Sequence, residues 1–126
     1  MYLYLASPYS SSDADEMQRR FEAAEAATAN LLRRDFAVYS PIVHCHALAR
    51  RYDLPTDFKF WETYNFRMLS TARILGILRL PGWETSNGVA GELNYARVHH
   101  IPVFYLIPES MDLGFDNEAL QDLFRR

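Results

Sequence analysis

The sequence predicts an α/β protein in which helices cover both faces of a parallel β-sheet. Apolar runs of about four to eight residues alternate along the chain with longer segments in which apolar residues recur at helical spacing. Serine, proline and glycine cluster in loops directly after these runs. A length of 126 residues suits one domain, so we expect a single domain over residues 1–126.

The first half of the chain is expected to hold two strands and two helices. Residues 2–6 are apolar and aromatic, as in a strand that is covered on both faces. In residues 14–34 apolar side chains recur three or four positions apart, which predicts one long helix. A second strand is expected at residues 36–39, ended by a Ser-Pro pair, and residues 42–52 should lead from a loop into a short helix.

The second half continues the alternation. A helix is expected at residues 58–71, strands at 74–80 and 101–108, a helix from about 88 to 99 between them, and a short amphipathic helix at 118–124. The residues expected to face inward from the first of these helices are Phe60, Trp61, Tyr64, Met68 and Leu69.

Composition narrows the classes of function. A net charge of −3 without a basic stripe argues against a nucleic-acid polymer as partner, but a few local donors can still hold one small anion. The single cysteine excludes a disulfide within the chain and suits a reducing compartment. No signal peptide is visible and no apolar run approaches the ~20 residues that span a bilayer. We therefore expect a cytoplasmic protein without a membrane partner.

Three loops are expected to form a ligand site. In open parallel sheets, ligands bind beyond the carboxyl ends of the strands, where the strand order reverses. The loops after the first three predicted strands contain ASPYSSS, SPIVHCH and PGWETSNG, and the residues that suggest chemistry gather in them.

Glu92 borders the apolar face of the helix that follows the third predicted strand. It lies three residues after Val89 and four before Ala96, so partial burial is expected. This spacing leaves two interpretations open. The carboxylate either favours the helix N-terminus electrostatically, worth ~0.3–1 kcal/mol when exposed, or it is a catalytic group.

Ser86, Asn87 and Gly88 form a candidate anion site at the start of the same helix. They offer a hydroxyl, an amide and a backbone that a ligand can approach closely. The loop is not a Walker A loop, because no Gly-Lys-Ser/Thr follows, and the dinucleotide fingerprint would belong after the first strand.

Several motifs together resemble the nucleoside 2-deoxyribosyltransferase-like superfamily, which includes nucleoside 5′-monophosphate N-glycosidases. They are YLASPYS, VYSPIVHCHAL, LPGWETSNGVAGELNYA with its Ser-x-Gly-x-x-x-Glu pattern, and VFYLIP. LPGW is most similar to a small bacterial and phage branch. The resemblance implies a flavodoxin-like three-layer fold and cleavage of the bond between a base and C1′ of a (deoxy)ribose, without a cofactor. It also implies a homodimer or larger homo-oligomer in which a neighbour helps to close the pocket.

The resemblance assigns roles to individual residues. Glu92 stands where the superfamily has its catalytic glutamate, which attacks C1′ or stabilises an oxocarbenium-like transition state. Tyr4 stands where a tyrosine orients that glutamate, and Ser7 and Pro8 would line the sugar end. Ser86 stands where transferases that act on free nucleosides tend to carry an acid.

With serine at this position, Ser86, Asn87 and Gly88 are expected to bind a 5′-phosphate. The predicted function is therefore hydrolysis of the N-glycosidic bond of a (deoxy)ribonucleoside 5′-monophosphate. The alternatives are a nucleoside deoxyribosyltransferase and a non-catalytic nucleotide-binding or sensor protein.

One departure from the superfamily concerns proton transfer to the base. An aspartate usually stands where this chain has Asn65, which can hydrogen-bond a base or sugar but cannot carry a proton. A second frequent aspartate is replaced by Arg73. The groups that remain as candidate acids are Asp57, Glu62, His44 and His46.

The remaining candidates have structural alternatives. We expect no metal site, because His44, Cys45 and His46 supply too few ligands for structural zinc. His44 or His46 is instead expected to point into the pocket and touch sugar or base, although both could lie on a surface loop. Trp83 could stack on a base or anchor its own loop. Arg19 and Arg20 are expected on a solvated face or at a subunit contact.

Overall fold

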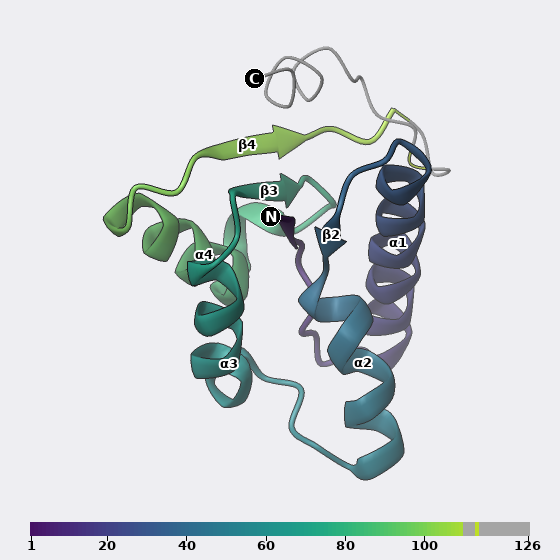
Figure 1. The fold of residues 1–126 in the computed structure, drawn as a ribbon. Helices are drawn as coiled ribbons and strands as arrows, with labels where there is room; N and C mark the ends of the chain where they lie inside the picture. Colours follow the sequence, from purple (N-terminus) through teal and green to yellow (C-terminus); the bar gives the residue numbers. More distant parts are fainter. Residues whose placement is uncertain (110–112, 114–126) are drawn as a thin grey trace.

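The computed structural model describes residues 1–109 and residue 113, and in them strands and helices alternate as expected (Figure 1). The elements are β1 (Leu3–Ala6), α1 (Ala14–Arg33), β2 (Val38–Tyr39), α2 (Pro41–Tyr52), α3 (Phe58–Ser70), β3 (Ile74–Leu78), the short 3-10 helix η1 (Trp83–Thr85), α4 (Asn87–Val98) and β4 (Val103–Leu106). The helix expected at residues 118–124 lies outside the described residues.

The four strands form one parallel sheet in the order β2-β1-β3-β4. The chain moves in one direction across the sheet from β1 to β2 and in the other from β3 to β4, so the order reverses between β1 and β3. This is a flavodoxin-like α/β topology, and the predicted fold class is confirmed. The carboxyl ends of β1 and β3 are therefore the place where a ligand site is expected.

Alternation along β1 divides the core between the two faces of the sheet. Leu3 and Leu5 pack with Ala27 and Leu31 of α1, while Tyr4 and Ala6 join the apolar cluster that α3 and α4 form on the other face. The right-handed crossovers from β1 to β2 and from β3 to β4 place α1 and α4 on opposite faces. α2 packs against α1 and β1 and, with the loop that follows it, extends beyond the carboxyl ends of the strands (Figure 1).

α2 is longer and starts earlier than expected, because residues 42–44 are already helical rather than a loop. Ser40 is the N-cap, and its side chain accepts a hydrogen bond from the Val43 amide at 3.2 Å. Pro41 takes the first helical position, where its missing N–H has no partner to lose. Cys45 and Ala49 follow Pro41 at four-residue intervals and are buried with it.

The predicted strands are longer than the observed ones. Residue 36 does not belong to β2, because Asp35 adopts a left-handed conformation (φ 64°) and the Phe36 amide bonds back to Leu31 O at 3.1 Å. At the end of β3 the Leu80 amide turns back to Leu78 O at 2.8 Å. The run predicted at 101–108 shortens to β4, which pairs with β3 only from residue 103 to 106.

The buried face of α3 also differs from the prediction. Asn65 and Leu69, four residues apart, are buried, whereas Phe60 is 49% exposed and Tyr64 is 37% exposed. The inward positions predicted for Phe60 and Tyr64 are therefore wrong for the single chain. These two residues are also four apart, and they occupy a neighbouring stripe of the same helix.

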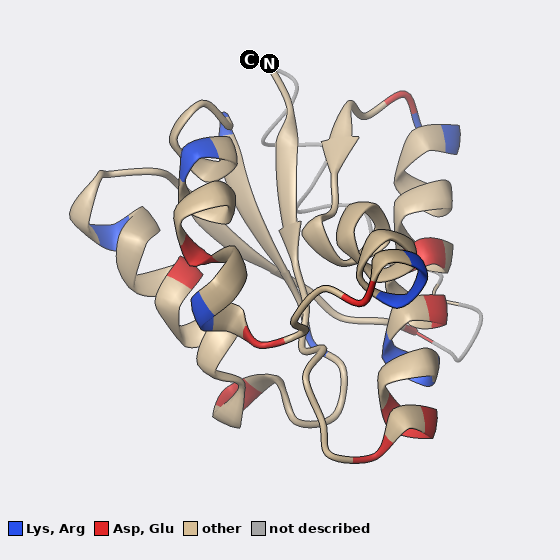
Figure 2. Ribbon diagram, turned by 90° about the horizontal axis from the view of Figure 1, so that it is seen from below, with Lys and Arg blue, Asp and Glu red and all other residues tan. Residues whose placement is uncertain are grey.

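Two features of the described part bear on partners. No helix within it is both long and apolar enough to cross a membrane. Acidic and basic residues are interspersed on the helices and loops of the described part (Figure 2).

Candidate active site

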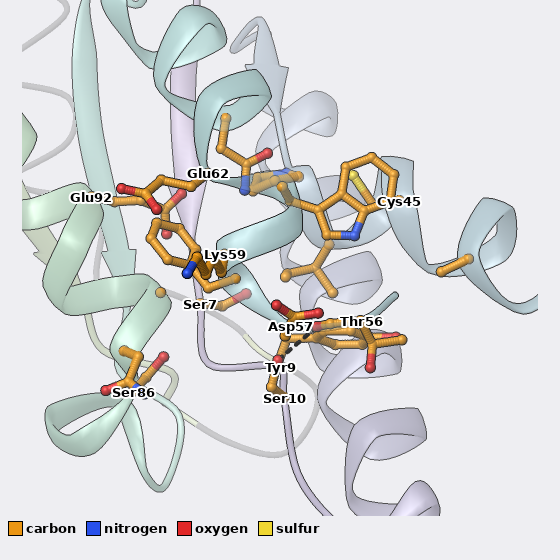
Figure 3. Close-up of a pocket in the computed structure, with 18 of the residues that line it drawn as sticks. Ser7, Tyr9, Ser10, Cys45, Thr56, Asp57, Lys59, Glu62, Ser86 and Glu92 are labelled. Atoms are coloured by element: carbon orange, nitrogen blue, oxygen red, sulfur yellow. Dashed lines mark hydrogen bonds between the residues drawn. The ribbon is translucent and has the colours of Figure 1, made fainter. Parts of the chain in front are cut away.

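A cavity of about 400 Å³ lies beyond the carboxyl ends of β1 and β3 (Figure 3). Its walls come from the loop after β1, from α2, from the α2–α3 loop, from α3 and from the start of α4. Six predicted site residues line it, namely Ser7, Asn65, Ser86, Asn87, Gly88 and Glu92. Tyr4 and Pro8 are fully buried and are not part of the cavity lining.

His44 does not line the cavity. It is exposed on α2, where its Nε2 lies 3.1 Å from the Tyr64 hydroxyl and the two rings stack at 5.8 Å. His46, two residues further along the helix, is buried and lines the cavity instead. Of the two histidines that were candidates for the pocket, the helical register of α2 selects His46.

Glu92 occupies the second turn of α4 and is only 3% exposed. Its neighbours Val89 and Ala96 are buried on the same helix, so the burial expected from the spacing is observed. Loss of hydration disfavours the ionised carboxylate and raises the pKa of Glu92 to about 8, although the interaction with the Tyr4 hydroxyl lowers it. The carboxyl group is thus mostly protonated in the free protein near neutral pH.

Tyr4 reaches Glu92 from the central strand β1. Its ring packs against Tyr39 at a centroid distance of 5.7 Å. Burial first, and the adjacent Glu92 second, raise the pKa of Tyr4 well above its ordinary value. The Tyr4 hydroxyl and the Glu92 carboxyl group interact electrostatically, but neither Tyr4 Oη nor Glu92 Oε2 makes a hydrogen bond of good geometry with any described residue.

Four polar atoms in and beside the cavity are buried without hydrogen-bond partners among the described residues. They are Tyr4 Oη, Ser7 Oγ, Asn65 Oδ1 and Glu92 Oε2. Each such group costs on the order of 1–3 kcal/mol when it is left unpaired. A polar ligand or water that pairs with them recovers this cost, which is the behaviour expected of a binding site.

The N-terminus of α4 forms one wall of the cavity. Ser86 caps the helix, and its Oγ accepts a hydrogen bond from the Val89 amide at 3.3 Å. The Ser86 O–H remains available to donate, and the Asn87 and Gly88 amides have no intrahelical acceptor at these positions. The expected anion site therefore has three donors at the positive end of a helix dipole.

Phe58 is a site residue that the sequence analysis missed. A Cβ added to Gly88 would lie 3.2 Å from Phe58 Cδ1, and one added to Gly91 would lie 2.8 Å from Phe58 Cε2. The two glycines, three residues apart, let the ring of Phe58 lie against α4. Their spacing was the available signal, but it did not identify the aromatic partner.

His46 is held by partners on both ring nitrogens. Its Nδ1 lies 2.6 Å from the Tyr9 hydroxyl, and its Nε2 lies 3.1 Å from Gln18 Oε1, which also accepts from Arg50 at 2.9 Å. Because an amide oxygen only accepts, Nε2 carries the proton and Nδ1 accepts from Tyr9. Burial and then Arg50 lower the pKa of His46, so the ring is neutral and positions Tyr9 in the cavity wall.

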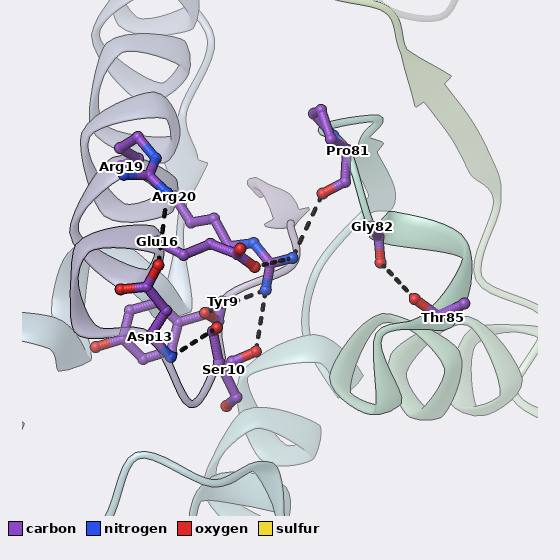
Figure 4. A network of polar contacts seen from close by, with 10 residues as sticks. Tyr9, Ser10, Asp13, Glu16, Arg19, Arg20, Pro81, Gly82 and Thr85 are labelled. Carbon is purple, nitrogen blue, oxygen red and sulfur yellow. Dashed lines mark hydrogen bonds and ion pairs between the residues drawn. The ribbon is translucent and has the colours of Figure 1, made fainter.

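Arg20 joins two of the loops that surround the site (Figure 4). Its guanidinium donates to Ser10 O at 3.0 Å and to Pro81 O at 3.5 Å, and it pairs with Glu16 at 2.8 Å. With a side chain 17% exposed, Arg20 is not on a solvated face as expected, whereas the side chain of Arg19, 64% exposed, is. The contact spans 61 residues of sequence, so no local pattern could reveal it.

Trp83 anchors its own loop rather than lining the cavity. Its ring packs against Tyr105 at 5.6 Å, and the guanidinium of Arg79 lies 5.1 Å from its centroid. Cys45 lines the cavity as a thiol, because burial raises its pKa to about 12. No group of three or more His, Cys, Asp or Glu side chains in the described part is arranged to hold a metal ion.

The fold and the site define a parallel α/β protein with a buried carboxyl group at the topological switch point of its sheet. The DUF1937 family, described as a domain of unknown function, matches residues 1–107, and the chain belongs to this family. A comparison with curated proteins gave no significant match.

Proposed function

We propose that the protein hydrolyses the N-glycosidic bond of a (deoxy)ribonucleoside 5′-monophosphate, as a member of the nucleoside 2-deoxyribosyltransferase-like superfamily. The observation that carries the proposal is Glu92, a carboxyl group buried against the cavity with an unpartnered oxygen. A buried, unpaired carboxyl is unfavourable for stability, and groups of this kind concentrate at functional sites.

Glu92 serves the reaction in its ionised form. It attacks C1′ of the sugar, or stabilises positive charge there, as the bond to the base breaks. The Tyr4 hydroxyl and the positive charge that develops at C1′ both favour the carboxylate over the protonated form. Tyr4 is held in β1 beneath the cavity and keeps the attacking oxygen in one place.

The α4 N-terminus binds the 5′-phosphate. The Ser86 hydroxyl and the Asn87 and Gly88 amides donate to the phosphate oxygens, and the helix dipole adds a favourable field. Lys59 also lines the cavity, and it is the only lysine or arginine among the lining residues of the described part. Figure 3 labels Lys59 together with Ser7, Ser86 and Glu92 among the side chains of the cavity.

The decisive experiment measures release of free base from the common (deoxy)ribonucleoside 5′-monophosphates. The wild type is expected to release base, and Glu92→Ala is expected to lose at least about 100-fold in kcat. Glu84→Gln is the control, because Glu84 is exposed and lies outside the cavity. Absence of base release from every monophosphate and every free nucleoside would overturn the proposal.

Nucleotide binding without turnover is the second candidate, and Asn65 is the observation that favours it. The amide lines the cavity and is 6% exposed, but it cannot carry a proton to a departing base. This function predicts that monophosphates raise the melting temperature without releasing base. A deoxyribosyltransferase would instead transfer the sugar to an added free base faster than to water.

We also propose that the protein self-associates through α3. Phe60 and Tyr64 leave a large aromatic area exposed beside the cavity, and Tyr64 stacks on the exposed His44. Light scattering coupled to gel filtration should show a dimer or larger species, which Phe60→Ser weakens. A wild-type monomer at the concentrations used for the activity assay would contradict this part of the proposal.

A further inference from the structure

We propose that Glu62 is the general acid that protonates the departing base, an inference that rests on the proposed function. A base leaves a sugar much more readily when its nitrogen receives a proton as the bond breaks. Asn65 cannot supply that proton. Another titratable side chain in contact with the cavity must therefore do so.

Three titratable side chains of the cavity are poor candidates for the proton donor. The neutral His46 donates its only ring proton to Gln18. Tyr9 donates its hydroxyl proton to His46 Nδ1 at 2.6 Å. Cys45 has a pKa raised to about 12 by burial, which makes its thiol a poor proton donor near neutral pH.

Asp57 and Lys59 have other duties at the start of α3. Asp57 is the N-cap of this helix, and its Oδ2 accepts a hydrogen bond from the Phe60 amide at 3.3 Å. Protonation of this oxygen would weaken the cap. Lys59 is the exposed second residue of α3 and supplies positive charge for the phosphate.

Glu62 is the carboxyl group that remains. It is half-buried, lines the cavity, and makes no hydrogen bond or ion pair with any residue of the described part. It lies three residues before Asn65 on α3, and both residues line the cavity from adjacent turns of the helix. The Glu62 carboxyl group therefore lies one helical turn from the Asn65 amide.

The proton balance of the reaction closes with these two carboxyl groups. In the first step the C1′–N bond breaks, the Glu92 carboxylate forms a bond to C1′, and protonated Glu62 gives its proton to the base nitrogen. In the second step water attacks C1′, the bond to Glu92 breaks, and the Glu62 carboxylate takes the proton from water. Both groups return to the states in which the first step began, Glu92 ionised and Glu62 protonated, and one water is consumed. The proton that Glu92 holds in the free protein leaves to the medium when the ligand binds and is not part of this cycle.

The test compares Glu62→Gln with wild type on two substrates. On unmodified monophosphates kcat should fall by about 100-fold or more, the usual effect of losing a general acid. On 7-methylguanosine 5′-monophosphate, whose base carries a fixed positive charge and leaves without protonation, kcat should fall less than about tenfold.

Further variants make the result decisive. Glu62→Asp keeps a carboxyl group and should recover part of the lost kcat, and Glu84→Gln should behave as wild type on both substrates. An equal loss on both substrates would show that Glu62 is not an acid, and no loss on either would remove it from the reaction. If wild type releases base, either result overturns only this assignment; if wild type releases none, the proposed function fails as well.

Discussion

At the scale of residues, Glu92 is the one acidic side chain in the described part of the chain that is buried. Its neighbours in the core are apolar or aromatic, and Tyr4 is the polar group that faces it. Burial at this position was predictable, because positions 89, 92 and 96 share one side of a helix. The raised pKa was not predictable, because it depends on how completely β1 and α3 exclude water from the carboxyl group.

Glu92→Gln should change how stability depends on pH. The pKa of Glu92 is about 8 in the folded protein and ordinary in the unfolded chain. Between these two values the folded state holds a proton that the unfolded state has released, so the free energy of unfolding falls as pH rises. Replacement by glutamine removes this fall, which amounts to up to about 3 kcal/mol between pH 5 and pH 8.

Urea denaturation at pH 5 and pH 8 measures this effect. Relative to wild type, the free energy of unfolding of Glu92→Gln should be higher at pH 8 than at pH 5. Glu84→Gln, a change at an exposed position, should have the same free energy of unfolding as wild type at both pH values. If the free energy of unfolding changes equally with pH in Glu92→Gln and in wild type, Glu92 ionises freely in the folded protein.

At the scale of elements, α4 combines a capped N-terminus with a glycine face that admits Phe58. The cap residue Ser86 follows from the sequence pattern, because a serine before a helical segment is a common start signal. The close approach of α3 does not follow from it. Which helix packs against the glycines is decided by the crossovers of the sheet, and α3 lies in a distant part of the sequence.

Ser86→Asp separates helix capping from phosphate binding. Aspartate caps helices as well as serine does and favours the N-terminal dipole, so the melting temperature should stay within a few degrees of wild type. Its negative charge repels a phosphate, so the apparent affinity for a nucleoside 5′-monophosphate should fall at least about tenfold. The thermal stabilisation that this ligand gives should fall with it. Differential scanning fluorimetry with a monophosphate and with the matching nucleoside measures both; equal loss for the two ligands would place the phosphate elsewhere.

Gly91→Ala should destabilise the packing of α3 against α4. Alanine favours a helix by about 1 kcal/mol over glycine, but its Cβ would lie 2.8 Å from Phe58 Cε2. Overpacking of this kind typically costs about 1–3 kcal/mol, so a net loss of about 1 kcal/mol is expected. A second change, Phe58→Leu, should remove the conflict, and the double-mutant cycle should show a favourable coupling. Additive effects of the two changes would contradict the contact.

At the scale of the whole molecule, the sequence predicts the layers and the parallel sheet better than the contacts between loops. The period of the apolar residues is enough to distinguish strands from helices, and alternation then gives a parallel sheet. The choice between His44 and His46 needs the register of α2, which depends on the cap at Ser40. The role of Arg20 needs the tertiary structure, because Ser10 and Pro81 meet only after β3 is placed beside β1.

Arg20→Ala should loosen the loops after β1 and β3 together. The change removes hydrogen bonds to both loops and an ion pair, so we expect a loss of about 1–3 kcal/mol in the free energy of unfolding. Arg19→Ala is the matched control, since its exposed side chain should contribute less than about 0.5 kcal/mol. Amide hydrogen exchange should speed up at both loops in Arg20→Ala. Faster exchange in only one loop would mean that Arg20 does not hold the two loops together.

In the free protein, the protonated Glu92 carboxyl group carries one exchangeable proton per chain. A ligand that requires the carboxylate must expel this proton into the medium, whereas a neutral ligand that accepts a hydrogen bond leaves it in place. The two kinds of ligand therefore respond in opposite ways to acidity, one being favoured by alkaline and the other by acidic surroundings. Occupancy of this pocket thereby couples to the proton concentration around the molecule, without any separate sensing element.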